Sequence, residues 1–173
     1  YDHILFLIVL AVVFSFNQWK KVLWLVTLFT IGHSITLALS AYGIVKMDMK
    51  LIEFLIPVTI FVTGAINVFT AKKSSAGKEN TNLIFALFFG LIHGLGFSNY
   101  FKMMIGKEED KLFPLLEFAL GIEAAQVIIV LGILFIGTIL QNFCRVTRRD
   151  WVLVTSSIVI GFAMQMMLDR VFW

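Results

Sequence analysis

Residues 112–143 read LFPLLEFALGIEAAQVIIVLGILFIGTILQNF and carry only two charged side chains, Glu117 and Glu123. A hydrocarbon core about 30 Å thick needs roughly 20 apolar residues in a helical span, so this run can cross a membrane even when tilted, kinked at Gly121 or broken. Closed β-barrels also cross membranes, but their strands alternate strictly between apolar and polar residues, and this run is apolar all round. The run therefore predicts a transmembrane helix.

Five further apolar runs, separated by charged or polar breaks, flank this one. They lie at about 2–16, 22–45, 51–71, 82–104 and 151–171. The first run is short for a span, and we expect part of it to lie upstream of Tyr1. The pattern predicts an all-α polytopic membrane helix bundle with about six transmembrane helices, in which residues 1–173 form a single transmembrane domain.

The composition of the whole chain agrees with a membrane protein. Of 173 residues, 60% are hydrophobic and 14% charged, and the mean hydropathy is +0.93. Soluble domains are about 45–50% apolar and about 25% charged, so soluble enzymes, nucleic-acid modules and disordered tails are excluded. The single cysteine, Cys144, excludes an internal disulfide and a CxxC metal site. We expect the lipid bilayer, and no nucleic acid, as a partner.

Basic residues in the loops indicate the orientation. We call side A the side that holds the first, third and fifth loops, and side B the side that holds the other loops and both termini. Side A carries eight basic residues, which are Lys20, Lys21, Lys72, Lys73, Lys78, Arg145, Arg148 and Arg149, against six on side B. Cytoplasmic loops carry the excess of Lys and Arg, so we expect side A in the cytoplasm and both termini outside.

All three histidines lie inside apolar runs, where an ionisable group costs roughly 2.5–3.5 kcal/mol at a helix centre. His33 and His93 each lie about eleven residues from side A, and Glu123 about eleven residues from side B, which at about 1.5 Å per residue places all three near the midplane. Asp2 and His3 begin their run on side B. These groups could therefore line a path from the outer surface to the membrane centre.

Nitrogen and carboxylate ligands together suit a divalent transition metal such as nickel, cobalt or zinc. The candidate metal ligands are Asp2, His3, His33, His93 and Glu123. The candidate supporting polar residues are Glu53, Asn67, Glu117, Gln126, Thr30 and Ser34. Each of these groups taken alone has an ordinary alternative, which is a hydrogen-bonding strut between helices, and Glu53 and Glu117 lie near enough to an interface to be solvated.

Gly90 and Gly94 form a GxxxG spacing, which lets two helices approach closely, and Gly96 follows at once. We expect these three glycines to serve helix packing. His3 and His93 lie 90 residues apart, as do His33 and Glu123. A weak inverted repeat of two three-span halves, as in many transporters, would give this offset. The flanking residues match poorly, so chance is the alternative.

The same segments resemble the HupE/UreJ family of small bacterial membrane proteins, generally regarded as nickel or cobalt permeases. The matching segments are Tyr1-Asp2-His3-Ile4-Leu5-Phe6, Phe29-Thr30-Ile31-Gly32-His33-Ser34-Ile35-Thr36-Leu37, Phe89-Gly90-Leu91-Ile92-His93-Gly94-Leu95-Gly96-Phe97 and Phe118-Ala119-Leu120-Gly121-Ile122-Glu123-Ala124-Ala125-Gln126, together with Glu53 and Asn67. The resemblance covers nearly the whole chain. It implies a multi-pass protein of the bacterial inner membrane.

The resemblance also implies roles for individual residues. Asp2, His3, His33 and His93 become candidate metal contacts, and the supporting residues are Glu53, Asn67, Glu123 and Gln126. A further histidine is implied upstream of the Asp2-His3 pair, beyond the start of this chain.

We interpret the chain as a nickel or cobalt permease or a metal-binding membrane protein, and not as an enzyme. Asp2 and His3 would capture the ion outside and pass it to His33, His93 and Glu123. No GxxxxGK[ST] motif is present, so ATP would not drive transport within the chain. Neutral imidazole is the ligand form, so low pH should weaken binding.

Three alternatives stay open at this stage. The first is a b-type haem protein ligated by His33 and His93. The second is an intramembrane metal-dependent hydrolase, although no HExxH motif is present. The third is a structural or accessory subunit without transport. A homo-oligomer or a partner membrane protein fits a chain of this size.

Overall fold

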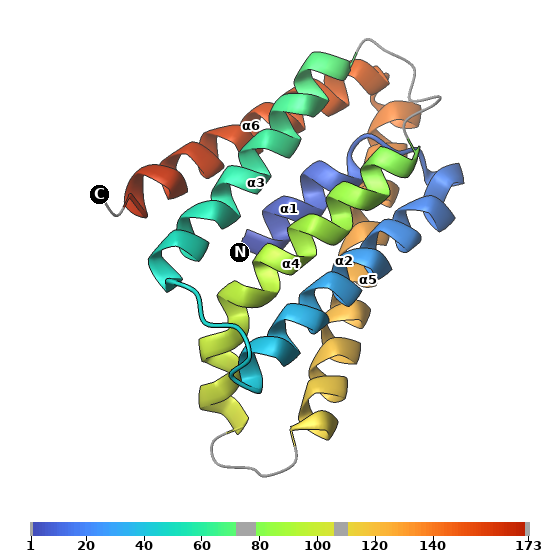
Figure 1. The fold of residues 1–173 in the computed structure, drawn as a ribbon. Helices are drawn as coiled ribbons and strands as arrows, with labels where there is room; N and C mark the ends of the chain where they lie inside the picture. Colours follow the sequence, from blue (N-terminus) through green and yellow to red (C-terminus); the bar gives the residue numbers. More distant parts are fainter. Residues whose placement is uncertain (1, 72–78, 106–110, 172–173) are drawn as a thin grey trace.

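The computed structural model describes residues 2–71, 79–105 and 111–171, and all regular structure in these ranges is helical (Figure 1). The elements are α1 (Asp2–Ala11), the short 3₁₀ turn η1 (Phe16–Gln18), α2 (Trp19–Ala41), α3 (Met49–Thr70), α4 (Glu79–Ile105), α5 (Leu112–Phe143) and α6 (Arg148–Asp169). The all-α prediction is confirmed over the described ranges.

Five of the six α-helices, α2 to α6, are long and apolar enough to cross a membrane. α1 has 10 residues, and at about 1.5 Å per residue it covers roughly half of a hydrocarbon core. The prediction of a polytopic helix bundle is confirmed, with five long spans and one short apolar helix. The inverted repeat, which would pair α1 with the 27-residue α4, stays a prediction.

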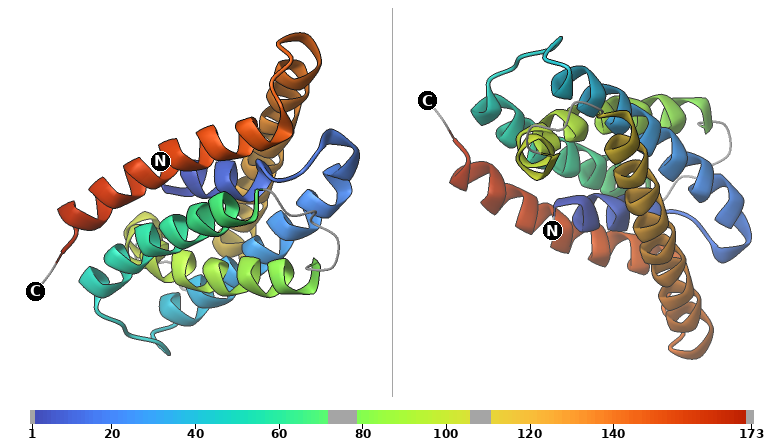
Figure 2. Two further views of the ribbon diagram at one scale, coloured as in Figure 1. Left: turned by 90° about the horizontal axis from the view of Figure 1, so that it is seen from above. Right: turned by 90° about the horizontal axis from the view of Figure 1, so that it is seen from below.

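The short α1 lies in the middle of the bundle. Both views in Figure 2 place it between α6 on one side and α3 and α4 on the other. Phe6, Val9 and Leu10 are buried in a core cluster built from α1, α2, α3, α4 and α6. Leu7 and Ala11 are buried in a second cluster with residues of α2 and α5. α1 is therefore packed against the other five α-helices through these two clusters.

Glycines let α2 and α4 pack backbone against backbone. A Cβ atom built on Gly90 would overlap the carbonyl oxygen of Phe29, and one built on Gly94 would overlap the carbonyl oxygen of His33. Thr36 Oγ1 donates across the same contact to the carbonyl of Leu91 (2.8 Å). The GxxxG spacing thus sets how closely the backbones of α2 and α4 approach each other. This contact positions His33 on α2 and His93 on α4.

Contacts between helix ends show which ends lie on the same side of the bundle. The grouping is the one expected when successive helices run in opposite directions. At the side B end, Arg170 Nη1 lies 2.9 Å from Asp2 Oδ2, which joins the end of α6 to the start of α1. Lys111 Nζ donates to a carbonyl at the end of α2 (2.9 Å). At the side A end, Arg148 donates to the carbonyl of Val13. The two chain ends therefore lie on the same side, and the assignment of side A to the cytoplasm stays a prediction.

Candidate metal centre

The three histidines meet inside the bundle although they come from three different helices. The ring of His3 on α1 lies 5.5 Å from that of His33 on α2 and 5.0 Å from that of His93 on α4, measured between centroids. Both contacts are edge to face. His33 and His93 are 1% and 0% exposed. The depth estimate from the sequence placed His33 and His93 near the midplane but His3 at the side B surface, whereas the fold brings the ring of His3 against the other two rings.

Each imidazole keeps at least one buried ring nitrogen without a hydrogen-bond partner. These atoms are Nε2 of His3, both ring nitrogens of His33, and Nδ1 of His93. Burying a polar atom without a hydrogen-bond partner costs free energy. Ring nitrogens in this state are the atoms to which a metal ion would bind. The donor set is therefore chemically fit to receive a divalent transition metal.

Thr59 on α3 determines which nitrogen of His93 is free. Its Oγ1 donates to the carbonyl of Ile56 (2.7 Å) and lies 3.3 Å from His93 Nε2. Because the single hydroxyl proton of Thr59 is already donated to Ile56, its oxygen accepts a hydrogen bond from Nε2–H, and Nδ1 keeps its lone pair. This arrangement resembles the hydrogen bonds that orient metal-binding histidines through their second nitrogen.

Phenylalanines surround the imidazoles and exclude water from them. Phe6 and Phe29 stack at 4.9 Å and lie 5.3 Å and 5.2 Å from the ring of His93. Phe97 packs edge to face on His3 at 5.0 Å. These apolar walls lower the local dielectric, so a bound cation would interact more strongly with the ring nitrogens than in water.

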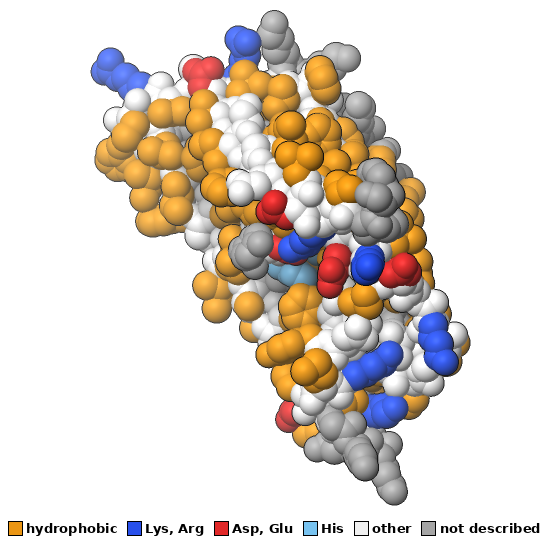
Figure 3. All heavy atoms as spheres, turned by 90° about the vertical axis from the view of Figure 1, so that its left-hand side faces the viewer, with side chains coloured by type: hydrophobic (Ala, Val, Ile, Leu, Met, Phe, Trp, Pro, Cys, Tyr) orange, Lys and Arg blue, Asp and Glu red, His pale blue; other side chains and the backbone are white. Residues whose placement is uncertain are grey.

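The site opens toward side B at His3. Figure 3 shows one pale-blue histidine surface in a recess bordered by red and blue side chains. His33 and His93 are buried, so the visible surface belongs to the half-buried His3. An ion arriving from side B would therefore meet His3 before the other two imidazoles.

Arg170 closes one edge of this opening, and sequence reasoning missed it. Pro57 inside α3 has no N–H, so the carbonyl of Glu53 four residues earlier lacks its helical donor. Arg170 Nη1 donates to that carbonyl (3.2 Å) and also pairs with Asp2. The signal was present in the sequence, since a proline inside a span predicts a freed carbonyl that needs a donor.

The acidic candidates lie apart from the three rings. Asp2, a predicted ligand, pairs with Arg170 at the opening. The side chains of Glu53 and Glu117 are exposed. Glu123 Oε1 accepts a hydrogen bond from Thr27 of α2 (2.6 Å). The structure thus brings the three predicted histidines together, and it gives the predicted carboxylates other partners or surroundings.

Three of the four neutral supporting candidates form struts between helices. Gln126 Oε1 accepts from Thr30 (2.9 Å), which joins α5 to α2. Asn67 on α3 donates to the carbonyl of Val9 (2.7 Å) at the end of α1, where helix carbonyls lack partners of their own. Ser34 is half-buried beside His33.

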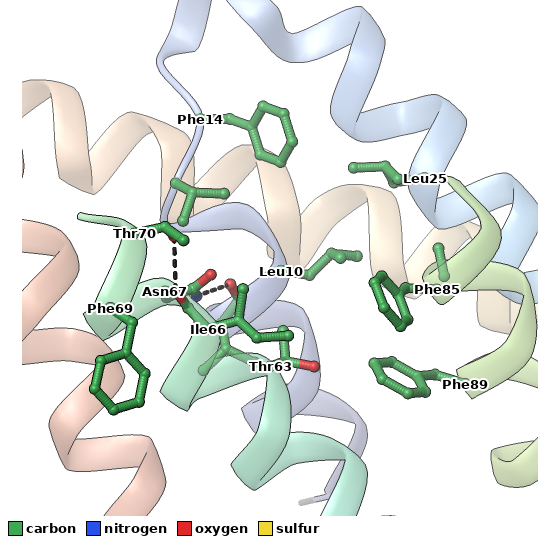
Figure 4. Close-up of a pocket in the computed structure, with 13 residues that line it drawn as sticks. Leu10, Phe14, Leu25, Thr63, Ile66, Asn67, Phe69, Thr70, Phe85 and Phe89 are labelled. Atoms are coloured by element: carbon green, nitrogen blue, oxygen red, sulfur yellow. Dashed lines mark hydrogen bonds between the residues drawn. The ribbon is translucent and has the colours of Figure 1, made fainter. Parts of the chain in front are cut away.

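Two further features involve α3. One is a cavity in the side A half of the bundle, and the other is a close contact with Gly96. A cavity of about 340 Å³ lies among α1, α2, α3 and α4, lined mainly by apolar side chains with Asn67 and Thr63 on its wall (Figure 4). Phe89 lines it and also packs on Phe6, so phenylalanines stand between the cavity and the histidines. Gly96 faces Ile56 of α3, where a Cβ atom would come within 2.6 Å.

The rings as they stand are packed on one another. Among the described His, Cys, Asp and Glu residues, no group of three or more is arranged to hold a metal ion. Imidazole nitrogens lie about 2.0–2.1 Å from a bound zinc ion, whereas edge-to-face rings aim carbon edges at their neighbours. Coordination would therefore require rotation of the side chains. Among the described residues the ring nitrogens of His33 have no hydrogen bond to break, whereas turning the ring of His93 would break its contact with Thr59 (3.3 Å).

The family comparison agrees with the resemblance seen in the motifs. The HupE / UreJ protein family matches residues 1–170. The chain belongs to the HupE/UreJ family. Its members are known as membrane proteins associated with nickel and cobalt transport, and the family is not an enzyme family. No curated protein and no solved structure matched the chain. With its long apolar helices, this HupE/UreJ member is a multi-pass membrane protein.

Proposed function

We propose that this protein is a permease for a divalent transition-metal ion, with nickel or cobalt as the substrate and zinc as a third candidate. His3, His33 and His93 hold the ion during its passage. The observation that carries the proposal is the convergence of three buried imidazoles with unpartnered ring nitrogens. Membership of a family associated with nickel and cobalt transport supports the same substrate class.

The donor chemistry favours these metals over the abundant hard cations. Imidazole nitrogen suits nickel, cobalt and zinc, whereas magnesium and calcium take oxygen ligands. At the opening the charge of Asp2 is compensated by Arg170, so the exposed carboxylate of Glu53 is the group that would attract cations from side B. Each ring must be unprotonated to bind, so binding strengthens as the pH rises and weakens as it falls.

The proposed path begins at His3 and continues inward. His3 receives a partly hydrated ion at the opening, and His33 and His93 replace its remaining water inside the phenylalanine walls. The three ligands come from α1, α2 and α4, so a small shift of α1 against the α2–α4 pair would change the coordination.

We place the protein in the bacterial inner membrane with both termini on the periplasmic side. It would act alone, as a homo-oligomer or with a membrane partner.

Elemental analysis of detergent-purified protein tests this proposal. We expect stoichiometric nickel or cobalt after loading, and its loss in both His33→Ala and His93→Ala. A matched control is Gln141→Ala on α5, whose amide donates only within its own helix (2.9 Å). Wild-type protein that takes up no nickel, cobalt or zinc would instead support a structural or accessory role.

A haem site fits the geometry less well. A porphyrin held between His33 and His93 would have to displace His3, whose ring contacts both. A Soret band in the purified protein would overturn this interpretation in favour of the haem protein.

A further inference from the structure

The cavity of about 340 Å³ in the side A half of the bundle is large enough to hold a ligand (Figure 4). Along α3 it extends from Thr63 to Thr70, which is about 10 Å of helix at about 1.5 Å per residue. Thr70 is the last residue of α3, so the cavity reaches the side A end of that helix. The wall includes residues of α2, α3 and α4, which are all long and apolar enough to cross a membrane. The cavity therefore lies at membrane depth.

The three polar residues on its wall already use their donors within the protein. Thr63 and Thr70 each donate to a carbonyl of α3 one turn earlier (2.8 Å and 2.6 Å). The amide of Asn67 donates to the carbonyl of Val9 (2.7 Å) and to Ser156 (3.4 Å). These three residues thus keep no side-chain proton for a ligand, and the other lining side chains are apolar. The wall suits a hydrocarbon better than a polar ligand.

The cavity opens between α3 and α4. On this side its wall residues Ile66 and Phe85 are 42% and 41% exposed, whereas Leu10, Leu25 and Ala86 on the inner wall are at most 9% exposed. At membrane depth such an opening faces lipid, and the apolar molecules there are acyl chains. An unfilled apolar cavity loses the dispersion contacts of its lining atoms, so entry of an acyl chain is favourable.

A cationic side chain lies at the side A edge of the cavity. Val13 lines the cavity, and its carbonyl accepts a hydrogen bond from Arg148 at the start of α6. The Arg148 side chain is exposed, and this one bond leaves other N–H groups of the guanidinium for a further partner. Guanidinium groups bind phosphate through paired hydrogen bonds. The headgroup of a lipid whose chain enters the cavity would lie at this edge.

We propose that this cavity binds one acyl chain of an anionic phospholipid from the side A leaflet, with the lipid phosphate on Arg148. The bound chain fills the space between α3 and α4 and acts as a structural ligand of the bundle. The inference does not rest on the proposed permease function, because none of the three histidines lines the cavity.

Photocrosslinking tests the position of the chain. Full-length protein is reconstituted into phosphatidylcholine vesicles that contain a phosphatidylglycerol with a diazirine in one acyl chain, and labelled residues are mapped by mass spectrometry. We expect label on Leu10 and Leu25, which lipid around the outside of the bundle does not reach because they are buried. Ile66→Trp should lower this inner label at least about tenfold, since the indole displaces buried methylenes. The matched control is Val62→Trp, on the same helix, 39% exposed and outside the cavity lining.

Label confined to exposed residues in the wild type would overturn the inference, as would inner label of equal strength in Ile66→Trp and Val62→Trp. Circular dichroism checks that each variant is folded. Phe85→Trp narrows the opening from the α4 side and replaces Ile66→Trp if that variant does not fold.

Native mass spectrometry of detergent-purified protein tests the headgroup. Dioleoyl phosphatidylglycerol and dioleoyl phosphatidylcholine, which differ only in the headgroup, are titrated separately. We expect the wild type to prefer the anionic lipid about fivefold, the effect typical of one basic residue near a headgroup. Arg148→Gln keeps a donor for Val13 but no charge, so it should lose this preference, whereas the adjacent and exposed Arg149→Gln should keep it. Equal binding of the two lipids by the wild type, or binding of free oleate in their place, would overturn the assignment to an anionic phospholipid.

Discussion

Thr59 contacts the proposed metal site through a hydrogen bond to His93. Its hydroxyl lies 3.3 Å from His93 Nε2 and leaves Nδ1 free. Outer partners of this kind typically contribute about 10–100-fold to metal affinity because they fix the tautomer and the ring orientation. We therefore propose Thr59 as a positioning residue for the metal site, and no pattern in the sequence pairs it with His93.

Replacing Thr59 by Val should weaken nickel binding about 10–100-fold without unfolding the protein. The valine keeps the shape of threonine but cannot accept a hydrogen bond from Nε2–H, so the ring loses the contact that sets its tautomer. Calorimetric titration of nickel into detergent-purified protein measures the effect. Thr138→Val is the matched control, since Thr138 donates only to Leu134 of its own helix (2.8 Å). Equal nickel affinities for Thr59→Val and wild type would show that Thr59 has no positioning role.

The structure groups the predicted histidine ligands together but not the predicted carboxylates. Counting residues along a span estimates the height of a side chain in the membrane, and it gives His33 and His93 similar heights. It does not fix the rotation of the helix or the choice of partner. Asp2 therefore pairs with Arg170 and Glu123 bonds Thr27, although both were predicted as metal ligands.

At the scale of the helices, a proline and an arginine are coupled. Pro57 frees the carbonyl of Glu53, and Arg170 supplies the missing donor while pairing with Asp2. This contact ties α6 to α1 and α3 at the opening of the site. The fold thus uses a helix irregularity to hold its last helix in place.

Arg170→Leu should lower the free energy of unfolding by about 1–3 kcal/mol, because a carboxylate and a carbonyl lose their donor. In a Pro57→Ala background the loss should be smaller, since the substituted alanine would provide the backbone N–H that the Glu53 carbonyl lacks. Denaturant unfolding in detergent of the four proteins of this double-mutant cycle measures the difference. Strict additivity of the two substitutions would show that Pro57 and Arg170 are independent.

The α2–α4 contact should tolerate no side chain at Gly94. A Cβ atom there overlaps the backbone of His33, so Gly94→Ala should separate the helices and cost about 1–3 kcal/mol of stability. Gly161→Ala on α6 is the control, because a Cβ atom there meets nothing within 4 Å. Thermal unfolding monitored by circular dichroism compares the two variants. A Gly94→Ala protein as stable as wild type would refute the close-packing role.

At the scale of the whole molecule, the contacts at the helix ends define two sides of the bundle. Chemical labelling of the single cysteine shows which of these sides faces the cytoplasm. Cys144 is exposed just after α5, at the side A end. If the basic loops are cytoplasmic, a membrane-impermeant maleimide should not label Cys144 in intact cells and should label it after permeabilisation. A Cys144→Ser, Met47→Cys variant places the thiol on an exposed side B loop residue and should be labelled from outside. Labelling of Cys144 in intact cells would reverse the orientation.

The apolar runs predicted the number and order of helices because a span must be long and uncharged. They predicted a first run that is short for a span, but not that α1 packs in the middle of the bundle, since burial against protein and burial against lipid select the same apolar residues. The motifs around His33 and His93 predicted the family, which the match over residues 1–170 confirms. The roles of the individual site residues stay predictions, because they depend on bound ions and on motion.

X-ray absorption at the nickel edge of nickel-loaded, detergent-purified protein tests the central claim most directly, because it detects the ligand atoms themselves. The account predicts the multiple-scattering signature of more than one imidazole, reduced in His93→Ala and in His33→Ala. A bound nickel ion surrounded by oxygen alone, with a spectrum that neither substitution changes, would contradict it.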